Sequence, residues 1–479
     1  MYRLLKVDVV NIISKIYDRI GIKQHTINEL SKIIENDKAT WDIYANGLTV
    51  CINQCEGTGT TNKAMKYKPR NISELTAFIA GIRPSFKSMY NIFESRQPFS
   101  YGVKAFDDLI QTEEMPYSFV LYQEQMMKAL NYAGFDMGDC YDIIKAISKK
   151  NVKLIMSAKE QFVEGFGQKI RETEPLLTDD KIKENCLKVW KIIEDGSKYG
   201  FNASHALAYA YDSVYCAWLK AHHPYEFYTE ILQTYSDKGE KDRVVKIIQE
   251  MDRGFGIKLG EYKFGLDNRQ FVMDKEKGVI YPSLLALKNF NEQAGIDLYE
   301  IRNKKFNTFT ELLIELVHNT SLDKTKINIL IKLGYFSDFG KNKKLFNVYE
   351  QFQKRYKKTH VEKTRMARKL EMIEFEHELK DESFGIKEQL KNEIEVLGYP
   401  ITKLEKAPED AYLITEIDDK YSTRTITLYK IKTGEFITCK ISKDDFMICP
   451  FGLASVMRVP ELYTTKQGNY YLRQYTVIG

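Results

Sequence analysis

The side chains best placed for chemistry lie in one stretch, residues 198–227, which reads KYGFNASHALAYAYDSVYCAWLKAHHPYEF. A glycine turn at Gly200 leads into a helix that opens with Asn202, Ser204 and His205, none of which favours a helix interior. Asn and Ser are explained as caps, because their oxygens accept hydrogen bonds from the unpaired N–H groups of a first turn. Capping does not explain His205 or the Gly200–Phe201 entry, and these positions need another role.

The element that must position these residues is a long helix that begins after Asn202. Its last turn holds His222 and His223, where positive charge suits the helix macrodipole, and Pro224 prevents continuation. One apolar stripe at three- and four-residue spacing marks the buried face: Ala206, Ala210, Val214, Ala217, Trp218 and Ala221.

Motifs of a self-contained active site are missing from the sequence. There is no GxxxxGK[ST] phosphate loop, no GxSxG nucleophile turn and no HExxH metal motif. Isolated histidines such as His25, His318 and His377 are typical of surface residues. The seven cysteines form no CxxC pair, which predicts free thiols in a reducing compartment and no structural zinc.

Length and charge narrow the class of protein. The 479 residues allow two to four domains. No stretch reaches the roughly 18 apolar residues of a membrane helix, and charges interrupt the N-terminal segment, so we expect no membrane partner and a cytoplasmic protein. The net charge is only +5, but the segment from Lys341 to Lys369 contains eleven basic residues and only two acidic ones. That segment is either a solvated helix face or one that follows phosphates.

The pattern changes several times along the chain. Residues 1–230 have helical spacing, residues 255–285 are strand-like and rich in glycine, and residues 286–345 predict short helices. The stretch 346–395 is charged and helical. After Pro400, alternation around KTGE and KQGN predicts paired strands of a small β-barrel. The predicted fold class is therefore multidomain and mainly α, with a small β-barrel at the C-terminal end.

Several segments, in order and at matching spacing, resemble the bacterial replicative DNA polymerase III alpha subunit. The stretch from Gly200 resembles the GFN-x-SHA element of its fingers domain. The other matching segments are NQCEGTGTTNKAM (53–65), TAFIAGIRP (76–84), VLYQEQMM (120–127), DIIKAISKK (142–150), ILIKLGYFSDFGKNKKLF (329–346) and VLGYPIT (396–402). The resemblance is nearly unbroken to about residue 345, patchy to 400 and limited to the fold beyond.

The resemblance implies a domain order. Residues 1–25 would end a palm domain, and 26–270 would form the fingers. Residues 271–345 would be a tandem helix-hairpin-helix region, 346–402 a charged helical connector, and 403–479 a barrel of the oligonucleotide-binding (OB) type.

The resemblance also implies which residues meet the substrates. Fingers close over the incoming nucleotide, and a glycine turn before a capped helix suits a phosphate, so His205 would donate to a phosphate or hold the turn. Residues implied in binding a dNTP are Lys145, Lys149, Lys150, Gly200, Asn202, Ser204 and His205. Residues of the other fingers motifs are Gln54, Glu56, Arg83, Tyr122, Gln123, Glu124 and Gln125. Ile144 and Lys145 replace the family's paired arginines, and Ser148 replaces its glycine. Lys145, Lys149 and Lys150 keep positive charge for a triphosphate. Because lysine is a point charge without the fork of a guanidinium, the contact should be less precise in geometry.

Primer–template DNA is the second implied partner. Asn289 and Asn291 stand near the place of a lost GVG hairpin, and we expect both to take left-handed conformations. The basic segment supplies the other predicted DNA-binding residues: Lys341, Lys343, Lys344, Lys354, Arg355, Lys357 and Lys358. The sequence DESFGIKEQL lies in the slot of the family's sliding-clamp box but lacks its Gln, which argues against clamp binding.

One catalytic carboxylate is implied. LLKVDVVNI (4–12) resembles the strand that bears the third palm aspartate, which gives Asp8 a catalytic, metal-binding role. An ordinary Asp at a strand end is the alternative. The two main palm aspartates have no counterpart, and one carboxylate cannot hold two Mg²⁺ ions. The cofactor pair would then be completed by an N-terminal half supplied by another chain.

The sequence thus predicts the C-terminal part of a DNA-directed DNA polymerase, a nucleotidyltransferase that is inactive without its missing palm half. Such a split suggests a phage or an interrupted gene. The rival interpretation is a non-catalytic DNA-binding module derived from the polymerase, favoured by the lost arginines and hairpin glycines. A drifted relic is a third.

Overall fold

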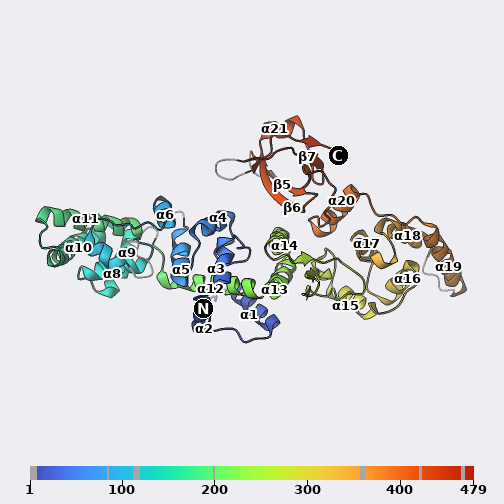
Figure 1. The fold of residues 1–479 in the computed structure, drawn as a ribbon, viewed down its shortest axis with the longest axis horizontal. Helices are drawn as coiled ribbons and strands as arrows, with labels where there is room; N and C mark the ends of the chain where they lie inside the picture. Colours follow the sequence, from blue (N-terminus) through green and yellow to red (C-terminus); the bar gives the residue numbers. More distant parts are fainter. Residues whose placement is uncertain are drawn as a thin grey trace. The chain divides into compact units, whose positions relative to one another are not determined.

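The computed structural model describes residues 8–83, 86–111, 119–197, 200–356, 362–419, 423–464 and 470–478. The chain forms two compact units that divide between Phe227 and Tyr228 (Figure 1). We describe each unit by itself.

The regular secondary structure of the first unit is helical in its described residues. Helix α13 (Pro224–Asp237) crosses the boundary to the second unit. The helices before it are α1 (Asp8–Ile20), α2 (Ile27–Ile34), α3 (Lys38–Ala45), α4 (Thr58–Tyr67), α5 (Ile72–Gly81), α6 (Lys87–Glu94), α7 (Lys104–Ile110), α8 (Gln123–Tyr132), α9 (Met137–Ser148), α10 (Val152–Thr173), α11 (Asp179–Gly196) and α12 (Ala203–His222).

Helix α12 is the helix predicted from the GFN-x-SHA stretch, and it lies at the centre of one half of this unit. It packs against α1, α2, α3 and α5. Every residue from Ser213 to Lys220 is buried, and Ala206, Ala210 and Val214 of the predicted stripe are fully covered. The other half of the unit consists of α7 to α11 around a core that contains Phe106, Phe162, Phe166 and Trp190.

The second unit begins with helix α14 (Lys241–Phe255) and a three-stranded sheet. Strand β3 (Val279–Tyr281) lies in the middle, parallel to β1 (Lys258–Leu259) and antiparallel to β2 (Val272–Asp274). These three strands lie within residues 255–285, the stretch whose pattern predicts strands. Short helices follow: η2 (Leu284–Ala286), α15 (Glu292–Ile301), α16 (Phe309–Asn319), α17 (Lys324–Lys332), η3 (Ser337–Phe339) and α18 (Asn342–Arg355).

Two helices of the charged stretch pack on this helical region. Glu376, in α19 (Glu362–Glu378), is almost fully buried and accepts hydrogen bonds from the backbone N–H groups of Phe309 and Thr310, each at 2.8 Å. It thereby caps the start of α16. Helix α20 (Ile386–Leu397) packs on α17, where Lys332 pairs with Glu395 at 2.9 Å.

The C-terminal region is a curled sheet (Figure 1). Its seven strands have the order β10-β7-β4-β5-β6-β9-β8. Residues alternate between its faces: Ile414 and Leu428 belong to the inner core, whereas Leu413 and Tyr429 pack with Leu390 of α20. The prediction of a mainly helical chain with a small OB-type barrel is confirmed. Its elements are β4 (Ala411–Asp418), β5 (Arg424–Lys430), β6 (Glu435–Ile441), α21 (Lys443–Ile448), β7 (Val456–Arg458), β8 (Tyr463–Thr464), β9 (Tyr470–Tyr471) and β10 (Thr476–Val477).

Within the described ranges, no helix is both long enough and apolar enough to cross a membrane.

Candidate functional site

Two of the predicted motifs, about eighty residues apart, meet through their backbones. Tyr122 and Phe201 form a parallel β-bridge. The N–H of Phe201 donates to the carbonyl of Leu121 at 3.1 Å, and the N–H of Gln123 donates to the carbonyl of Phe201 at 3.0 Å. We call residues 121–125 and 200–205 the fingers junction. The structure therefore brings the YQEQ and GFN-x-SHA elements together.

Gly200 is needed because the chain passes close to its neighbours. A Cβ atom at this position would lie 2.5 Å from Cε of Met126 and 3.1 Å from the carbonyl oxygen of Gly196. Both separations are below ordinary van der Waals contact. A larger residue would require the Met126 side chain to move and the backbone at Gly196 to shift, so the glycine serves close packing.

Capping explains Asn202, but the prediction that Ser204 is a cap is wrong, because Ser204 lies within the first turn of α12. Asn202 is the N-cap, and its Oδ1 accepts from the N–H of His205 at 2.9 Å, as predicted. Glu124 reaches across the junction, and its Oε2 accepts from the N–H of Ala203 at 2.9 Å. A carboxylate at a helix N-terminus is favoured by the macrodipole. The chain's own carboxylate thus occupies this helix end, while Ser204 and His205 are exposed.

Gln125 and Tyr122 have internal roles. Oε1 of Gln125 accepts from the N–H groups of Leu121 at 2.8 Å and Tyr122 at 2.9 Å, and its Nε2 donates to the carbonyl of Phe119 at 2.9 Å. Burial raises the pKa of the Tyr122 hydroxyl above its ordinary value. Both residues hold the junction in shape. Gln123 is half-buried beside Gly200.

A row of rings in edge-to-face contact runs from the junction along α12. The guanidinium carbon of Arg83 lies 3.3 Å from the ring centroid of Phe201. His205 lies edge-on to Phe201 at 5.2 Å between centroids and to Tyr209 at 4.3 Å. Burial lowers the pKa of Arg83, which reflects partial desolvation of its cation. We call these four residues the junction stack; its rings and cation suit a base or a phosphate.

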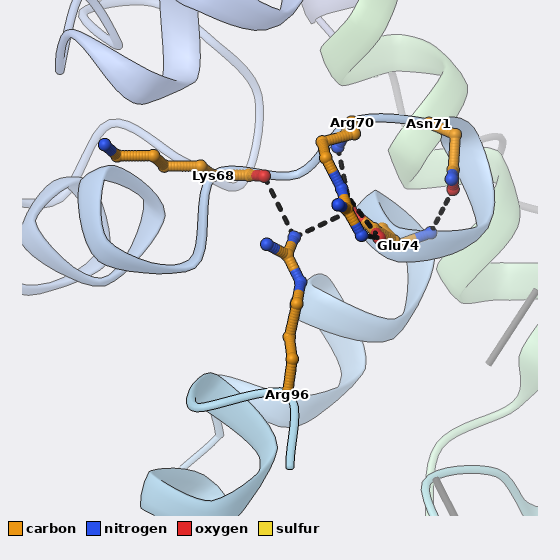
Figure 2. A network of polar contacts seen from close by, with 5 residues as sticks. All are labelled: Lys68, Arg70, Asn71, Glu74 and Arg96. Carbon is orange, nitrogen blue, oxygen red and sulfur yellow. Dashed lines mark hydrogen bonds and ion pairs between the residues drawn. The ribbon is translucent and has the colours of Figure 1, made fainter. Parts of the chain in front are cut away.

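A buried carboxylate fixes the helix that leads to Arg83. Figure 2 shows Glu74, in the first turn of α5, between two arginines. Nη2 of Arg70 donates to Oε1 at 2.6 Å, and Nη2 of Arg96 donates to Oε2 at 2.7 Å and to the carbonyl of Lys68 at 2.9 Å. Asn71 caps the same turn through the N–H of Glu74 at 2.8 Å. The start of α5 is thus tied to the ends of α4 and α6.

A second buried charge holds the loop that carries Gln54 and Glu56. Lys220 of α12 is fully buried, and its Nζ donates to the carbonyls of Leu48 at 2.8 Å and Val50 at 2.6 Å. The loop then turns sharply, with a φ of 63° at the exposed Gln54. Glu56 closes it by accepting from the N–H of Cys51 at 3.0 Å. A positive φ outside glycine is uncommon, so the side chain of Gln54 is presented at a conformational cost.

The sequence did not single out Glu74, Arg96 or Lys220. Glu74 follows Asn71 by three residues, a capping pattern, but its pairing with Arg96 spans 22 residues and has no local signal. Lys220 had one visible signal, because it interrupts an apolar run in CAWLKAH. A lysine there must either leave the stripe or find buried acceptors.

The three predicted nucleotide-binding lysines lie together at the end of α9 and are exposed. Lys145 is in its last turn, Lys149 is the C-cap, and Lys150 has a φ of 58°. Ser148, which stands where the family has glycine, donates through Oγ to the carbonyl of Ser197 at 2.8 Å. This bond ties the end of α9 to the end of α11, three residues before Gly200.

Asp8 is the first residue of helix α1 and is exposed. The predicted strand is wrong for residues 8–12, which are helical; residues 4–7 lie outside the described ranges. An acidic residue in a first helical turn is favoured by the macrodipole, which explains the helical start. No group of three or more His, Cys, Asp or Glu residues in the described ranges could hold a metal ion. Asp8 by itself does not fit a two-Mg²⁺ site, so its metal role stays a prediction.

The hairpin before α15 follows the prediction in part. Asn289 has a φ of 68°, the left-handed conformation that was expected. Asn291 does not: its φ is −131°, and its Oδ1 caps α15 by accepting from the N–H of Ala294 at 3.2 Å. A residue that caps a helix normally has an extended backbone, because its side-chain oxygen can then accept a hydrogen bond from the first turn. Capping therefore explains why Asn291 is not left-handed. Glu292 follows in the first turn, which adds negative charge to this helix end.

The basic segment is partly neutralised by nearby acids. Nζ of Lys343 pairs with Oε1 of Glu382 at 3.1 Å, and the backbone N–H groups of Lys341 and Lys344 donate to Asp381 and to the carbonyl of Glu382. At the end of α18, Lys354 and Arg355 are exposed; Lys357 and Lys358 lie outside the described residues.

Comparison with known proteins agrees with this arrangement. Residues 9–169 match the bacterial DNA polymerase III alpha subunit finger domain, and residues 255–346 match a helix-hairpin-helix motif. The resemblance to the polymerase III alpha subunit is confirmed. The matched fingers region contains the loop of Gln54, the YQEQ element and the α9 lysines, and the matched hairpin region contains α15 to α17.

Individual relatives carry the same name. The chain is 27% identical to the DNA polymerase III subunit alpha of Ureaplasma parvum over 365 residues, which cover 74% of this chain and 36% of the relative. It is 28% identical to that of Bacillus subtilis over 351 residues, covering 71% and 30%, and 27% identical to that of Aquifex aeolicus over 426 residues, covering 84% and 34%. The chain therefore spans about a third of the length of the curated relatives it matches.

Proposed function

We propose that this chain binds primer–template DNA and an incoming dNTP for template-directed DNA synthesis, as the fingers, hairpin and barrel region of a polymerase III alpha subunit. The main palm aspartates would be supplied by another chain. The observation that carries the proposal is the fingers junction, where two motif segments are joined by backbone hydrogen bonds and support the junction stack.

Each part of the fingers has a role in this proposal. The exposed lysines at the end of α9 offset the negative charge that builds up on the leaving pyrophosphate. The rings of His205 and Phe201 pack against the base or sugar of the nucleotide. Glu124 and Gln125 keep the junction rigid, so that these groups are already in place before a nucleotide binds.

The metal ions of such a reaction would clamp the attacking and leaving oxygens, but the described residues do not supply the carboxylates that hold them. We therefore assign no step to them. Asp8 would contribute one carboxylate to a set completed elsewhere.

The rival function is a DNA-binding module without catalysis. The exchange of the paired arginines for Ile144 and Lys145 favours it, because lysine cannot form the two-pronged contact of a guanidinium with a phosphate. The two functions make different predictions for a reconstituted enzyme.

Primer extension distinguishes them. The purified chain alone is expected to extend no primer, and addition of a polymerase III alpha fragment that bears the palm aspartates is expected to restore extension. In the restored enzyme, Asp8→Asn should abolish extension while duplex affinity stays unchanged. Asp18→Asn, an exposed position on the same helix, is the matched control and should be silent. Extension by the chain alone refutes the split site, and no extension in any mixture supports the module.

A further inference from the structure

Helix α15 carries an aromatic ring between two arginines, which neither the motifs nor the comparisons assign to a function. The guanidinium carbon of Arg269 lies 3.5 Å from the ring centroid of Tyr299, and that of Arg302 lies 3.4 Å from it. Two planar cations this close to one centroid fit only on opposite faces of the ring. We call these three residues the arginine–tyrosine stack.

Arg269 is held in this position from three sides. Its Nε and Nη2 donate to the two carboxylate oxygens of Asp267 at 2.9 Å and 2.8 Å. Its Cγ lies 3.7 Å from the place of a Cβ on Gly295, so the side chain runs along α15 where the helix has no side chain of its own. Its backbone carbonyl accepts from Oγ of Ser283 at 3.1 Å. The hydrogen bond from Arg269 lowers the pKa of Asp267, which keeps that carboxylate charged.

Arg302 is held by a backbone carbonyl and not by a carboxylate. Its Nη1 donates to the carbonyl of Tyr299 at 2.6 Å, and among the described residues no carboxylate forms an ion pair with it. Stacking on Tyr299 fixes the guanidinium plane while its other N–H groups remain available. A guanidinium that is fixed beforehand loses little entropy when it binds a phosphate.

The arginine–tyrosine stack lies at the C-terminal end of α15. Asn291, Gly295 and Tyr299 follow one another at four-residue spacing on one face of α15, and Arg302 is the C-cap. Ten helical residues span about 15 Å, which equals the rise of about four base pairs along the axis of a DNA duplex. Asn289 and Asn291 carry no positive charge and Glu292 adds a negative one; the exposed Lys288 is a cation before this helix, and Arg302 lies at its other end.

We propose that Arg269 and Arg302, held on the two faces of Tyr299, form a phosphate-binding site for the backbone of duplex DNA. The site replaces contacts that the hairpin lost with its glycines. The proposal rests on the proposed DNA binding and adds to it where the duplex is held. Asp267 partly opposes the site, because it covers the outer edge of Arg269 with negative charge.

Because Asp267 and the two arginines carry opposite charges, substitutions at Arg302 and at Asp267 should change the affinity for DNA in opposite directions. Duplex affinity is measured by fluorescence anisotropy on a labelled 24-base-pair DNA from about 50 to 200 mM salt, with the full chain. Arg302→Gln should weaken binding on the order of fivefold and reduce the slope of log K against log salt by about 0.9, since one phosphate contact is lost. Asp267→Asn should strengthen binding by about twofold, because a screened negative charge is removed.

Arg253→Gln is the control, because Arg253 is an exposed arginine in the last turn of a helix, whereas Arg302 is a partly exposed C-cap. It should change neither affinity nor slope. Thermal unfolding confirms that each variant is folded, and the gain expected for Asp267→Asn cannot come from unfolding.

The outcomes separate the two proposals. If the unaltered chain binds no duplex, both the DNA-binding function and the phosphate site are refuted. If it binds with a clear salt slope, but Arg302→Gln and Asp267→Asn behave like Arg253→Gln, only the phosphate site is refuted.

Discussion

Two arginine–aromatic stacks in this chain are supported in opposite ways. In the first unit, Arg83 lies on Phe201, and the stack continues through His205 and Tyr209. The two helices next to it in the sequence contain buried polar residues, Glu74 in α5 and Lys220 in α12. In the second unit, Tyr299 is covered by Arg269 and Arg302, which are held by surface contacts.

The difference shows what each stack offers a ligand. The junction stack offers rings and one partly desolvated cation, which suits a single nucleotide bound in a fixed place. The arginine–tyrosine stack offers two charged edges to solvent, which suits a phosphate backbone bound without regard to sequence. It follows that substitutions under the first stack should cost stability, and substitutions at the second should cost affinity.

The largest loss of stability is expected for Lys220→Met. Methionine preserves most of the apolar volume but leaves the carbonyls of Leu48 and Val50 without their donor. We expect the free energy of unfolding to fall by about 2 to 4 kcal/mol, measured by urea unfolding. Lys153→Met, at an exposed position on α10, is the control and should be neutral. A loss below about 1 kcal/mol for Lys220→Met would mean that the loop is held by other groups.

Gly200→Ala should come next. Its Cβ meets Met126 and the carbonyl of Gly196, so the junction must shift. The expected loss is about 1 to 3 kcal/mol in the same urea experiment. Gly138→Ala tests the generality of the effect, because nothing lies within 4 Å of a Cβ at Gly138 in helix α9. Because alanine favours a helix more than glycine does, Gly138→Ala should raise the free energy of unfolding by up to about 1 kcal/mol. Equal responses at the two glycines would contradict the close-packing role of Gly200.

Glu124→Gln should have a smaller effect. The amide oxygen still accepts from the N–H of Ala203, but the favourable interaction of the negative charge with the α12 dipole is lost. We expect about 0.5 to 1 kcal/mol of destabilisation by urea unfolding at low salt, and less at high salt. Glu160→Gln, exposed in the middle of α10, provides the comparison without a helix end. An increase in stability would show that the carboxylate is not the cap of α12.

The smallest change is expected for Tyr299→Phe, which keeps the ring and therefore both stacked arginines. Stability should stay within about 0.5 kcal/mol and duplex affinity within about twofold. Tyr299→Leu removes the ring face and should lower duplex affinity about two- to fivefold with little further loss of stability. Equal affinities for the Phe and Leu variants would show that the ring does not organise the arginines.

Local patterns in the sequence predicted much of this structure. The stripe of Ala206, Ala210 and Val214, the cap at Asn202 and the stop at Pro224 gave α12 with its bounds, because each acts over one or two turns. The strands around KTGE followed from alternation and the glycine turn. Motif order identified the fingers residues before their contacts were known.

What the sequence could not predict depends on contacts between distant segments. The bond from Glu124 to Ala203 joins residues 79 apart, and that from Lys220 to Leu48 joins residues 172 apart. Asn291 was given a left-handed conformation because its type permits one, but capping of α15 prevailed. The ion pair of Lys343 had no local signal, because its partner Glu382 lies about forty residues later. The predicted domain limits, nucleotide contacts and metal role of Asp8 remain predictions.

Hydrogen exchange read by mass spectrometry tests the central claim most directly, because it reports both stacks in one experiment. The chain is compared alone, with primer–template DNA, and with DNA plus the matching dNTP. The proposed roles predict that DNA alone slows exchange in the segment 288–305, and that exchange in 200–209 slows only after the nucleotide is added. If primer–template DNA leaves residues 288–305 unchanged and the nucleotide leaves 200–209 unchanged, the account of this chain as a DNA- and nucleotide-binding polymerase region is contradicted.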